Sequence, residues 1–124
     1  MTPPSIHPEN ALTAFSGSEQ ELARIFGELK RRVLAVQGGS GARFVLFGSR
    51  ARGDHDEGSD IDIAIIVPGL TWAGKCAILD AVADVELDND VVLATFVIST
   101  GEFERLRARE RRIALDIERE GIPL

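Results

Sequence analysis

Apolar residues recur at helical spacing in the first part of the chain. Ser18 is followed three residues later by Glu21, a pairing typical of a capping box at a helix start. The apolar positions behind it are Leu22, Ile25, Phe26, Leu29, Val33 and Val36. This spacing predicts an amphipathic helix over residues 18–37, which the glycines at positions 38, 39 and 41 end.

Three short apolar segments have the character of strands. Residues 44–47 (FVLF) form an apolar run that suits a buried strand, and residues 60–67 (DIDIAIIV) form a second one that stops at Pro68-Gly69. Residues 91–98 (VVLATFVI) are rich in β-branched side chains and predict a third strand. The first two strands are joined by residues 48–59, a polar and glycine-rich connector.

Two further helices follow from the same kind of pattern. Residues 71–87 place Trp72, Cys76, Leu79 and Ala83 along one stripe, which we expect to be buried, and residues 88–90 form a turn. Ser99 with Glu102 makes another capping box, which opens a helix to about residue 119. Its expected buried face consists of Phe103, Leu106, Ile113 and Ile117, and Gly121 stands where a C-terminal cap belongs.

The order helix, strand, loop, strand, helix, strand, helix predicts a small α/β sandwich. About three strands form a mixed sheet, and helices must cover its apolar faces. A chain of 124 residues is long enough for one such domain and too short for two. We therefore expect a single domain over residues 17–124, preceded by a flexible leader at residues 1–16 with three prolines.

Composition narrows the class of protein. With 44% hydrophobic residues, a mean hydropathy of +0.03 and no apolar run near the roughly 20 residues of a membrane helix, a soluble protein is expected. The start, residues 1–9, lacks the basic and apolar segments of a signal peptide, and the single cysteine excludes an internal disulfide. Both observations favour the cytoplasm. The net charge of −6 argues against broad nucleic-acid binding, which needs a basic surface.

Candidate chemistry begins with two aspartates at the start of the second strand. Asp60 and Asp62 are two residues apart, so in a strand both side chains lie on one face while Ile61, Ile63 and Ile65 point to the other. Two adjacent carboxylates repel one another unless a cation neutralises them or one takes up a proton. Hard oxygen ligands suit Mg²⁺ or Mn²⁺. The alternative is a pair of solvated aspartates at a strand end.

A phosphate-binding element precedes this pair. Gly48 directly after an apolar strand allows the backbone to approach a ligand, and the next turn can open a helix whose N–H groups face an anion. Ser49 adds a hydroxyl donor, and Arg50 and Arg52 add guanidinium groups that match phosphate geometry. Taken singly, each residue is equally typical of a plain loop.

The pattern Gly48-Ser49, ten residues, then Asp60-Ile61-Asp62 resembles the motif of the DNA polymerase β nucleotidyltransferase superfamily. Its context, FGSRARGDHDEGSDIDIAI, is similar to the minimal nucleotidyltransferase (MNT) domains of bacteria and archaea. The resemblance implies a nucleoside triphosphate, such as ATP, at Gly48 and Ser49, and divalent metal on Asp60 and Asp62. It implies transfer of a nucleoside monophosphate to an acceptor hydroxyl with release of pyrophosphate. Many MNT domains resemble antitoxins paired with a helical HEPN toxin, and some nucleotidylate that partner on tyrosine.

The chain departs from the family at the third carboxylate, commonly assigned as the base that helps to activate the acceptor. Strand 91–98 has no acid, and Ala94 or Thr95 stands where the aspartate is expected; Asp90 would need a shifted register. A non-catalytic antitoxin or regulatory subunit that acts by binding its partner is therefore the rival of an active enzyme. A small-molecule modifier is a third candidate, although it would need a second domain or a homo-oligomer to hold the acceptor.

Other residues admit two interpretations each. His55 could approach the triphosphate, although a solvated loop residue is the simpler interpretation, and Trp72 could stack on a base or pack at the edge of a core. The last predicted helix carries Arg105, Arg107, Arg109, Arg111 and Arg112 with acids between them. This arrangement predicts a solvated face with intrahelical ion pairs, the alternative being a docking surface.

Overall fold

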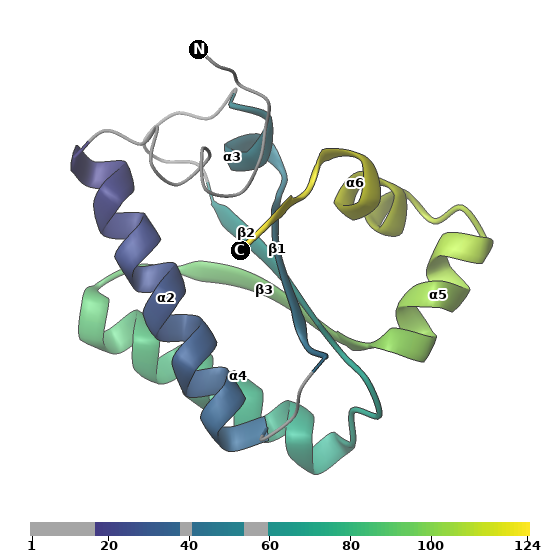
Figure 1. The fold of residues 1–124 in the computed structure, drawn as a ribbon, viewed down its shortest axis with the longest axis horizontal. Coiled ribbons are helices and arrows are strands. Elements are labelled where there is room, and N and C mark those ends of the chain that lie inside the picture. The colour runs from purple at the N-terminus through teal and green to yellow at the C-terminus, as the bar shows by residue number, and fades with distance from the viewer. Residues whose placement is uncertain (1–16, 38–40, 54–59) are drawn as a thin grey trace.

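The computed structural model describes residues 17–37, 41–53 and 60–124, and it shows an α/β fold. A mixed sheet lies in the middle, helices α2 and α4 cover one face, and helices α5 and α6 cover the other (Figure 1). The predicted fold class is confirmed. The predicted leader, residues 1–16, lies outside the described residues. In the part of the chain described, no helix is long and apolar enough to cross a membrane.

The sheet has four strands, one more than the sequence pattern predicts. They are β1 (Arg43–Phe47), β2 (Ile61–Val67), β3 (Leu93–Ser99) and β4 (Ile122–Pro123), in the spatial order β3-β2-β1-β4. β1 pairs antiparallel with β2 and with β4, while β2 pairs parallel with β3. The parallel pair is joined by helix α4, as a parallel connection requires.

Alternation along β2 divides the core into two layers. Ile61, Ile63, Ile65 and Val67 pack in the larger cluster together with buried residues of α2 and α4. Ala64 and Ile66 face the other way and pack against Phe103, Ala114 and Ile117 of α5 and α6. The sequence therefore assigned the faces of β2 correctly, and the same alternation places Asp62 on the α5–α6 side of the sheet.

Helix α2 (Gly17–Gln37) matches the prediction closely, with Ile25, Phe26, Leu29 and Val33 buried. It begins one residue earlier than predicted, so Ser18 lies within the helix, and the carboxylate of Glu21 forms an ion pair with Arg24 on the next turn. The side chain of Ser18 lies outside what the structure describes, so the predicted capping box stays a prediction.

Helix α4 (Trp72–Asn89) is also present, but its predicted buried stripe is wrong. The residues that pack in the core are Ile78, Ala81, Val82 and Val85. Trp72 is 76% exposed and Leu79 is 40% exposed, and Ala83 is exposed too. The error has a physical cause: α4 is apolar on two opposite faces, so spacing alone does not say which one meets the sheet. The predicted turn at residues 88–90 is shortened, because the helix continues to Asn89 and Asp90 caps it.

The single last helix predicted from the sequence is in fact two. Helix α5 (Thr100–Ala108) and helix α6 (Arg112–Glu120) are separated by a turn in which Glu110 adopts a φ of 54°. The hydroxyl of Ser99 accepts a hydrogen bond from Glu102 N at 3.0 Å, which confirms that half of the predicted capping box. Arg105 pairs with Glu102, and Arg107 pairs with Glu104, so the predicted intrahelical ion pairs are present.

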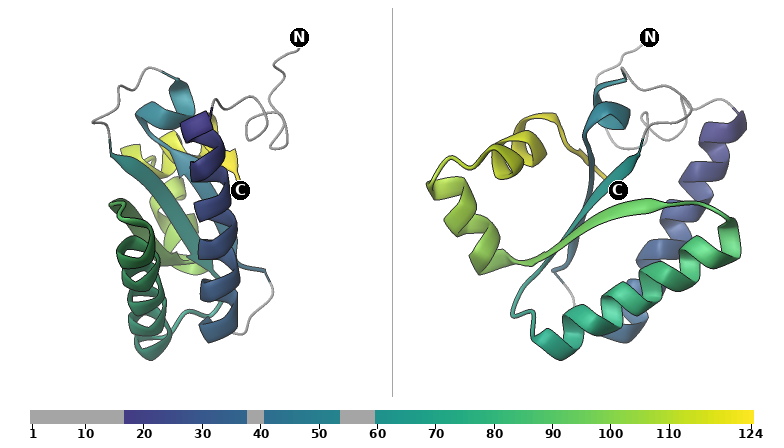
Figure 2. Two further views of the ribbon diagram at one scale, coloured as in Figure 1. Left: turned by 90° about the vertical axis from the view of Figure 1, so that its left-hand side faces the viewer. Right: turned by 180° about the vertical axis from the view of Figure 1, so that it is seen from behind.

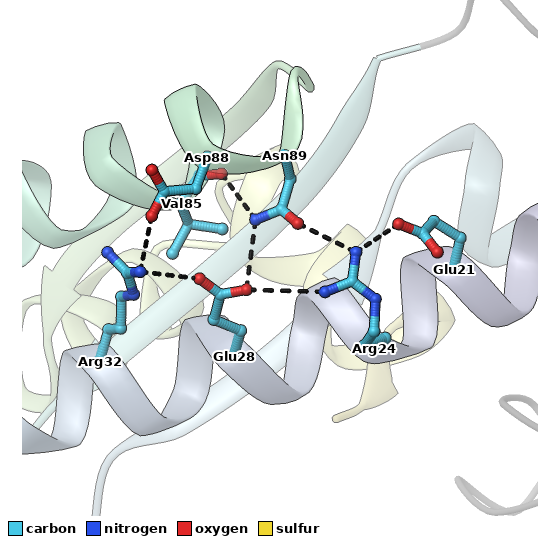
Figure 3. A network of polar contacts seen from close by, with 7 residues as sticks. All are labelled: Glu21, Arg24, Glu28, Arg32, Val85, Asp88 and Asn89. Carbon is cyan, nitrogen blue, oxygen red and sulfur yellow. Dashed lines mark hydrogen bonds and ion pairs between the residues drawn. The ribbon is translucent and has the colours of Figure 1, made fainter.

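A polar network fastens α2 to the end of α4 (Figure 3). Arg32 bridges Glu28 at 3.0 Å and Asp88 at 2.7 Å, and Arg24 donates a hydrogen bond to the side-chain oxygen of Asn89 at 3.0 Å. The amide of Asn89 in turn donates to Glu28 at 3.3 Å and to the carbonyl of Val85 at 2.9 Å. This side of α4 is therefore committed to α2, and its C-terminal turn is fixed.

Candidate active site

The candidate site lies where β1 ends and β2 begins. Because the two strands are antiparallel, the last residue of one is next to the first residues of the other. Phe47 is the register partner of Asp62, and Gly48 follows immediately. The sheet thus brings together the two halves of the motif, which are ten residues apart in the sequence.

Gly48 lies directly against the carboxylate of Asp62. A Cβ atom at position 48 would overlap Oδ2 of Asp62 and lie 3.1 Å from its Cγ. Gly48 has φ 77° and ψ −158°, a backbone conformation that essentially only glycine adopts. Glycine is required here for two independent reasons: other residues rarely adopt this backbone conformation, and a side chain would collide with Asp62.

One turn of helix follows, α3 (Ser49–Arg52). The carbonyl of Gly48 accepts hydrogen bonds from Ala51 N and Arg52 N, each at 3.1 Å, and the carbonyl of Ser49 accepts one from Gly53 N at 2.9 Å. Gly53 ends the turn in the left-handed region with φ 84°. Ser49 and Arg50 are half-buried in this turn, next to Gly48.

Arg52 connects this turn to the C-terminal part of the chain. Its Nη1 atom lies 3.1 Å from Oε1 of Glu120, the last residue of α6. The pKa of Asp62 is raised by burial and by the charge of Asp60, and the positive charge of Arg52 partly opposes that rise. Glu120 was not predicted as part of the site, because its approach to Arg52 depends on how α6 packs.

The two aspartates differ in their surroundings. Asp60 is exposed and Asp62 is half-buried. The pKa of Asp62 is raised above its ordinary value, first by burial and then by the negative charge of Asp60, while Arg52 opposes the shift. The carboxylates therefore interact, as their spacing predicts. Adding positive charge relieves this repulsion.

No acidic side chain of β3 joins them. Ala94 is the register partner of Asp62 on this strand and is exposed, while Thr95 is the partner of Ile63 and so belongs to the opposite face. Asp90 caps α4 in a left-handed conformation, three residues before β3 begins. Within the described residues no group of three or more acidic, histidine or cysteine side chains could hold a metal ion. His55 lies outside those residues.

The residues present suit one divalent cation and an anionic ligand. Two carboxylates that repel one another offer hard oxygen donors, which Mg²⁺ and Mn²⁺ prefer. At Gly48 the space that a side chain would fill is taken up by the carboxylate of Asp62, so glycine allows the turn and the carboxylate to lie against each other. Ser49, Arg50 and Arg52 line the same turn with donors for phosphate oxygens.

The model of the nucleotidyltransferase domain family matches residues 22–118, and the chain belongs to that family. Members act in general on nucleotide substrates with divalent metal.

One curated protein and one solved structure are similar to the chain. Over 78 residues the chain is 32% identical to the "Putative protein adenylyltransferase MJ0141" of Methanocaldococcus jannaschii. The aligned region covers 62% of this chain and 79% of that protein. A crystal structure of a "putative nucleotidyltransferase" from Sulfolobus solfataricus is similar over 88% of this chain and 86% of that one, with 20% identity and a TM-score of 0.46.

Proposed function

We propose that this domain binds a nucleoside triphosphate, ATP in the first place, together with Mg²⁺ or Mn²⁺, and transfers the nucleoside monophosphate to an acceptor hydroxyl. The observation that carries the proposal is the packing of Gly48 against Asp62, which joins a phosphate-binding turn to a carboxylate pair. The relative named as a protein adenylyltransferase supports AMP as the transferred group and a protein as the acceptor.

Each residue has a role in this proposal. Gly48 and Ser49 bind triphosphate oxygens, Asp60 and Asp62 hold the metal, and Arg50 and Arg52 offset negative charge. The bound metal would polarise the phosphoryl group and neutralise charge on the triphosphate. In the transfer, the acceptor oxygen bonds to the α-phosphorus, the bond from that phosphorus to the bridging oxygen of the β-phosphate breaks, and pyrophosphate leaves. The proton of the acceptor hydroxyl passes to solvent or to a base on the acceptor.

The acceptor we propose is a hydroxyl of a HEPN-type partner protein, with this domain as its antitoxin. A tyrosine hydroxyl is chemically suited, because its pKa near 10 makes it a better nucleophile than a serine at neutral pH. An acceptor of that kind depends less on a strong base in the enzyme, and none of the described β3 side chains is acidic.

A transfer assay tests the proposal. The full chain is incubated with α-labelled ATP, Mg²⁺ and a HEPN-like protein encoded next to it, and label on the partner is followed. We expect transfer by the native chain and none by Asp60→Asn plus Asp62→Asn. The matched control is Asp80→Asn plus Asp84→Asn, which removes the same charge from exposed positions of α4. Transfer that survives the first double substitution contradicts the assigned roles.

One observation favours a second function. Ala94 occupies the position beside Asp62 where an acid would help to bind a second metal. A domain that binds nucleotide and neutralises its partner by occlusion would need no such acid. In that case the double variant Asp60→Asn plus Asp62→Asn still forms the complex and still neutralises the partner, and no label is transferred by any variant.

A further inference from the structure

The outer side of α4 carries an apolar row that the fold does not use. Trp72, Cys76, Leu79, Ala83 and Leu87 recur every three or four residues, which places them on one face of the helix, and we call them the outer row of α4. Trp72 is 76% exposed, Leu79 40% and Leu87 81%. A helical spacing of 100° per residue puts this row opposite the buried residues Ile78, Ala81, Val82 and Val85.

Four of the five side chains of this row are exposed, and Cys76 is half-buried. The neighbouring side of α4 is fastened to α2 through Asp88 and Asn89 (Figure 3), and α4 runs along the rim of the molecule in both views of Figure 2. Single exposed apolar residues are ordinary on a protein surface, but a helix with a second continuous apolar face marks an interaction site.

We propose that the outer row of α4 is a homodimer interface, in which α4 packs antiparallel against α4 of a second copy of this chain. The row alternates large and small side chains, in the order Trp, Cys, Leu, Ala, Leu, and this alternation reads the same in both directions. Reversal of one helix therefore produces a matching surface, which is what a twofold symmetric interface needs.

The register follows from the ends of the row. When Trp72 lies opposite Leu87 of the second copy, Cys76 lies opposite Ala83, and the two Leu79 side chains meet near the twofold axis. The small residues at 76 and 83 leave room beside the central leucines, so that the helices can approach closely.

Charge on one flank of the row supports the same arrangement. Lys75 and Glu86 lie on the side of α4 toward β3, where Glu86 accepts a hydrogen bond from Leu93 N at 2.7 Å. In an antiparallel pair each flank faces the same flank of the second copy. Lys75 of one copy therefore faces Glu86 of the other, and the two residues differ by about 3 Å in position along the helix axis. A carboxylate accepts several hydrogen bonds, so Glu86 can hold Leu93 and pair with Lys75.

The other flank carries Asp80 and Asp84, which would face the same acids of the second copy. Their repulsion favours a packing of the two α4 helices in which the flanks with Lys75 and Glu86 lie close together. The flanks with Asp80 and Asp84 then lie further apart and are exposed to solvent. A single pair of helices with one repulsive flank predicts a weak dimer, with a dissociation constant in the micromolar range.

Sedimentation velocity over a range of protein concentrations tests the interface. The native chain should dimerise, and Leu79→Lys should raise the dissociation constant by about thirtyfold or more, as expected for a central apolar residue. Leu34→Lys is the matched control, because Leu34 is 38% exposed on α2 and Leu79 is 40% exposed on α4. It should leave the dimer unchanged, and circular dichroism should show both variants folded.

Crosslinking tests the orientation independently of affinity. Cys76 is the single cysteine of the chain, so a short bis-maleimide reports directly on its neighbours. The antiparallel register predicts little crosslinking of the native chain and efficient covalent dimers of Ala83→Cys. A chain that stays monomeric at all concentrations, a dimer that survives Leu79→Lys, or crosslinking of Cys76 to Cys76 in the native chain would each overturn the proposal.

Discussion

Replacement of Gly48 by alanine is the sharpest test of the contact that joins the two halves of the site. The backbone at position 48, with φ 77° and ψ −158°, lies in a region nearly exclusive to glycine, which costs another residue about 1–3 kcal/mol. The new methyl group would also overlap Oδ2 of Asp62, and overpacking of this kind costs a further 1–3 kcal/mol or so. Gly48→Ala should therefore lower the free energy of unfolding by about 2–6 kcal/mol.

Gly53→Ala is the control for the backbone contribution. Gly53 also has a positive φ, of 84°, but a Cβ atom there would meet nothing within 4 Å. Its loss should be limited to the left-handed penalty of about 1–2 kcal/mol. Urea unfolding of both variants without metal gives the comparison. Addition of Asp62→Ala to Gly48→Ala should recover part of the loss, since it removes the atoms that the methyl group overlaps.

The stabilities of the two glycine variants can also contradict the contact between Gly48 and Asp62. If Gly48→Ala and Gly53→Ala lose the same stability, the methyl group meets no obstacle at Asp62. A double variant no more stable than Gly48→Ala alone would lead to the same conclusion. The close approach of the turn at Gly48 to the carboxylate of Asp62, on which the proposed function depends, would then be wrong.

Three further predictions concern single positions. Because the pKa of Asp62 is raised, the folded chain holds this proton more tightly than the unfolded chain, so metal-free stability falls as the pH rises through this pKa. Asp62→Asn should remove that fall, and urea unfolding at a series of pH values should show the stability advantage of the variant growing with pH. A stability difference that stays constant with pH would contradict the prediction. Ala94→Asp should place a third carboxylate beside Asp62 and raise the number of Mn²⁺ ions bound with an ATP analogue from one to two, measured by electron paramagnetic resonance; an unchanged number would count against the assigned position. Gly121→Ala should lower the free energy of unfolding by about 1–3 kcal/mol, measured by denaturant unfolding. The φ of −70° suits alanine, but the new methyl group would overlap Val45 Cγ1 and the carbonyl of Ile117. Unchanged stability would contradict this close packing.

The strands and helix α2 were predictable because their patterns are local. In β2 the alternation from Ile61 to Val67 fixes both the strand and its faces, and α2 has a single apolar stripe. Strand β4 was not predictable, since Ile122 and Pro123 have no strand pattern of their own and pair only because β1 lies beside them. The break between α5 and α6 also has no local signal, because Glu110 adopts its positive φ without a glycine or proline nearby in the turn.

The candidate site divides in the same way. Its backbone and carboxylate elements follow from a motif within one stretch of sequence, and the strand pairing explains why Gly48 meets Asp62. Contacts between residues far apart in the sequence, such as that of Arg52 with Glu120, cannot be predicted from the local spacing of residues. The prediction for helix α4 was wrong in its buried face: the apolar stripe expected in the core is the exposed row from which the dimer is inferred.

The central claim, that Asp60 and Asp62 hold one metal for a triphosphate at Gly48 and Ser49, is tested most directly by counting bound metal ions. Mn²⁺ is titrated in the presence of a non-hydrolysable ATP analogue and followed by electron paramagnetic resonance. We predict one tightly bound Mn²⁺ per chain, lost in Asp62→Asn and retained in Asp84→Asn. Tight binding that persists in Asp62→Asn, or a native chain that binds neither metal nor analogue, would contradict the account.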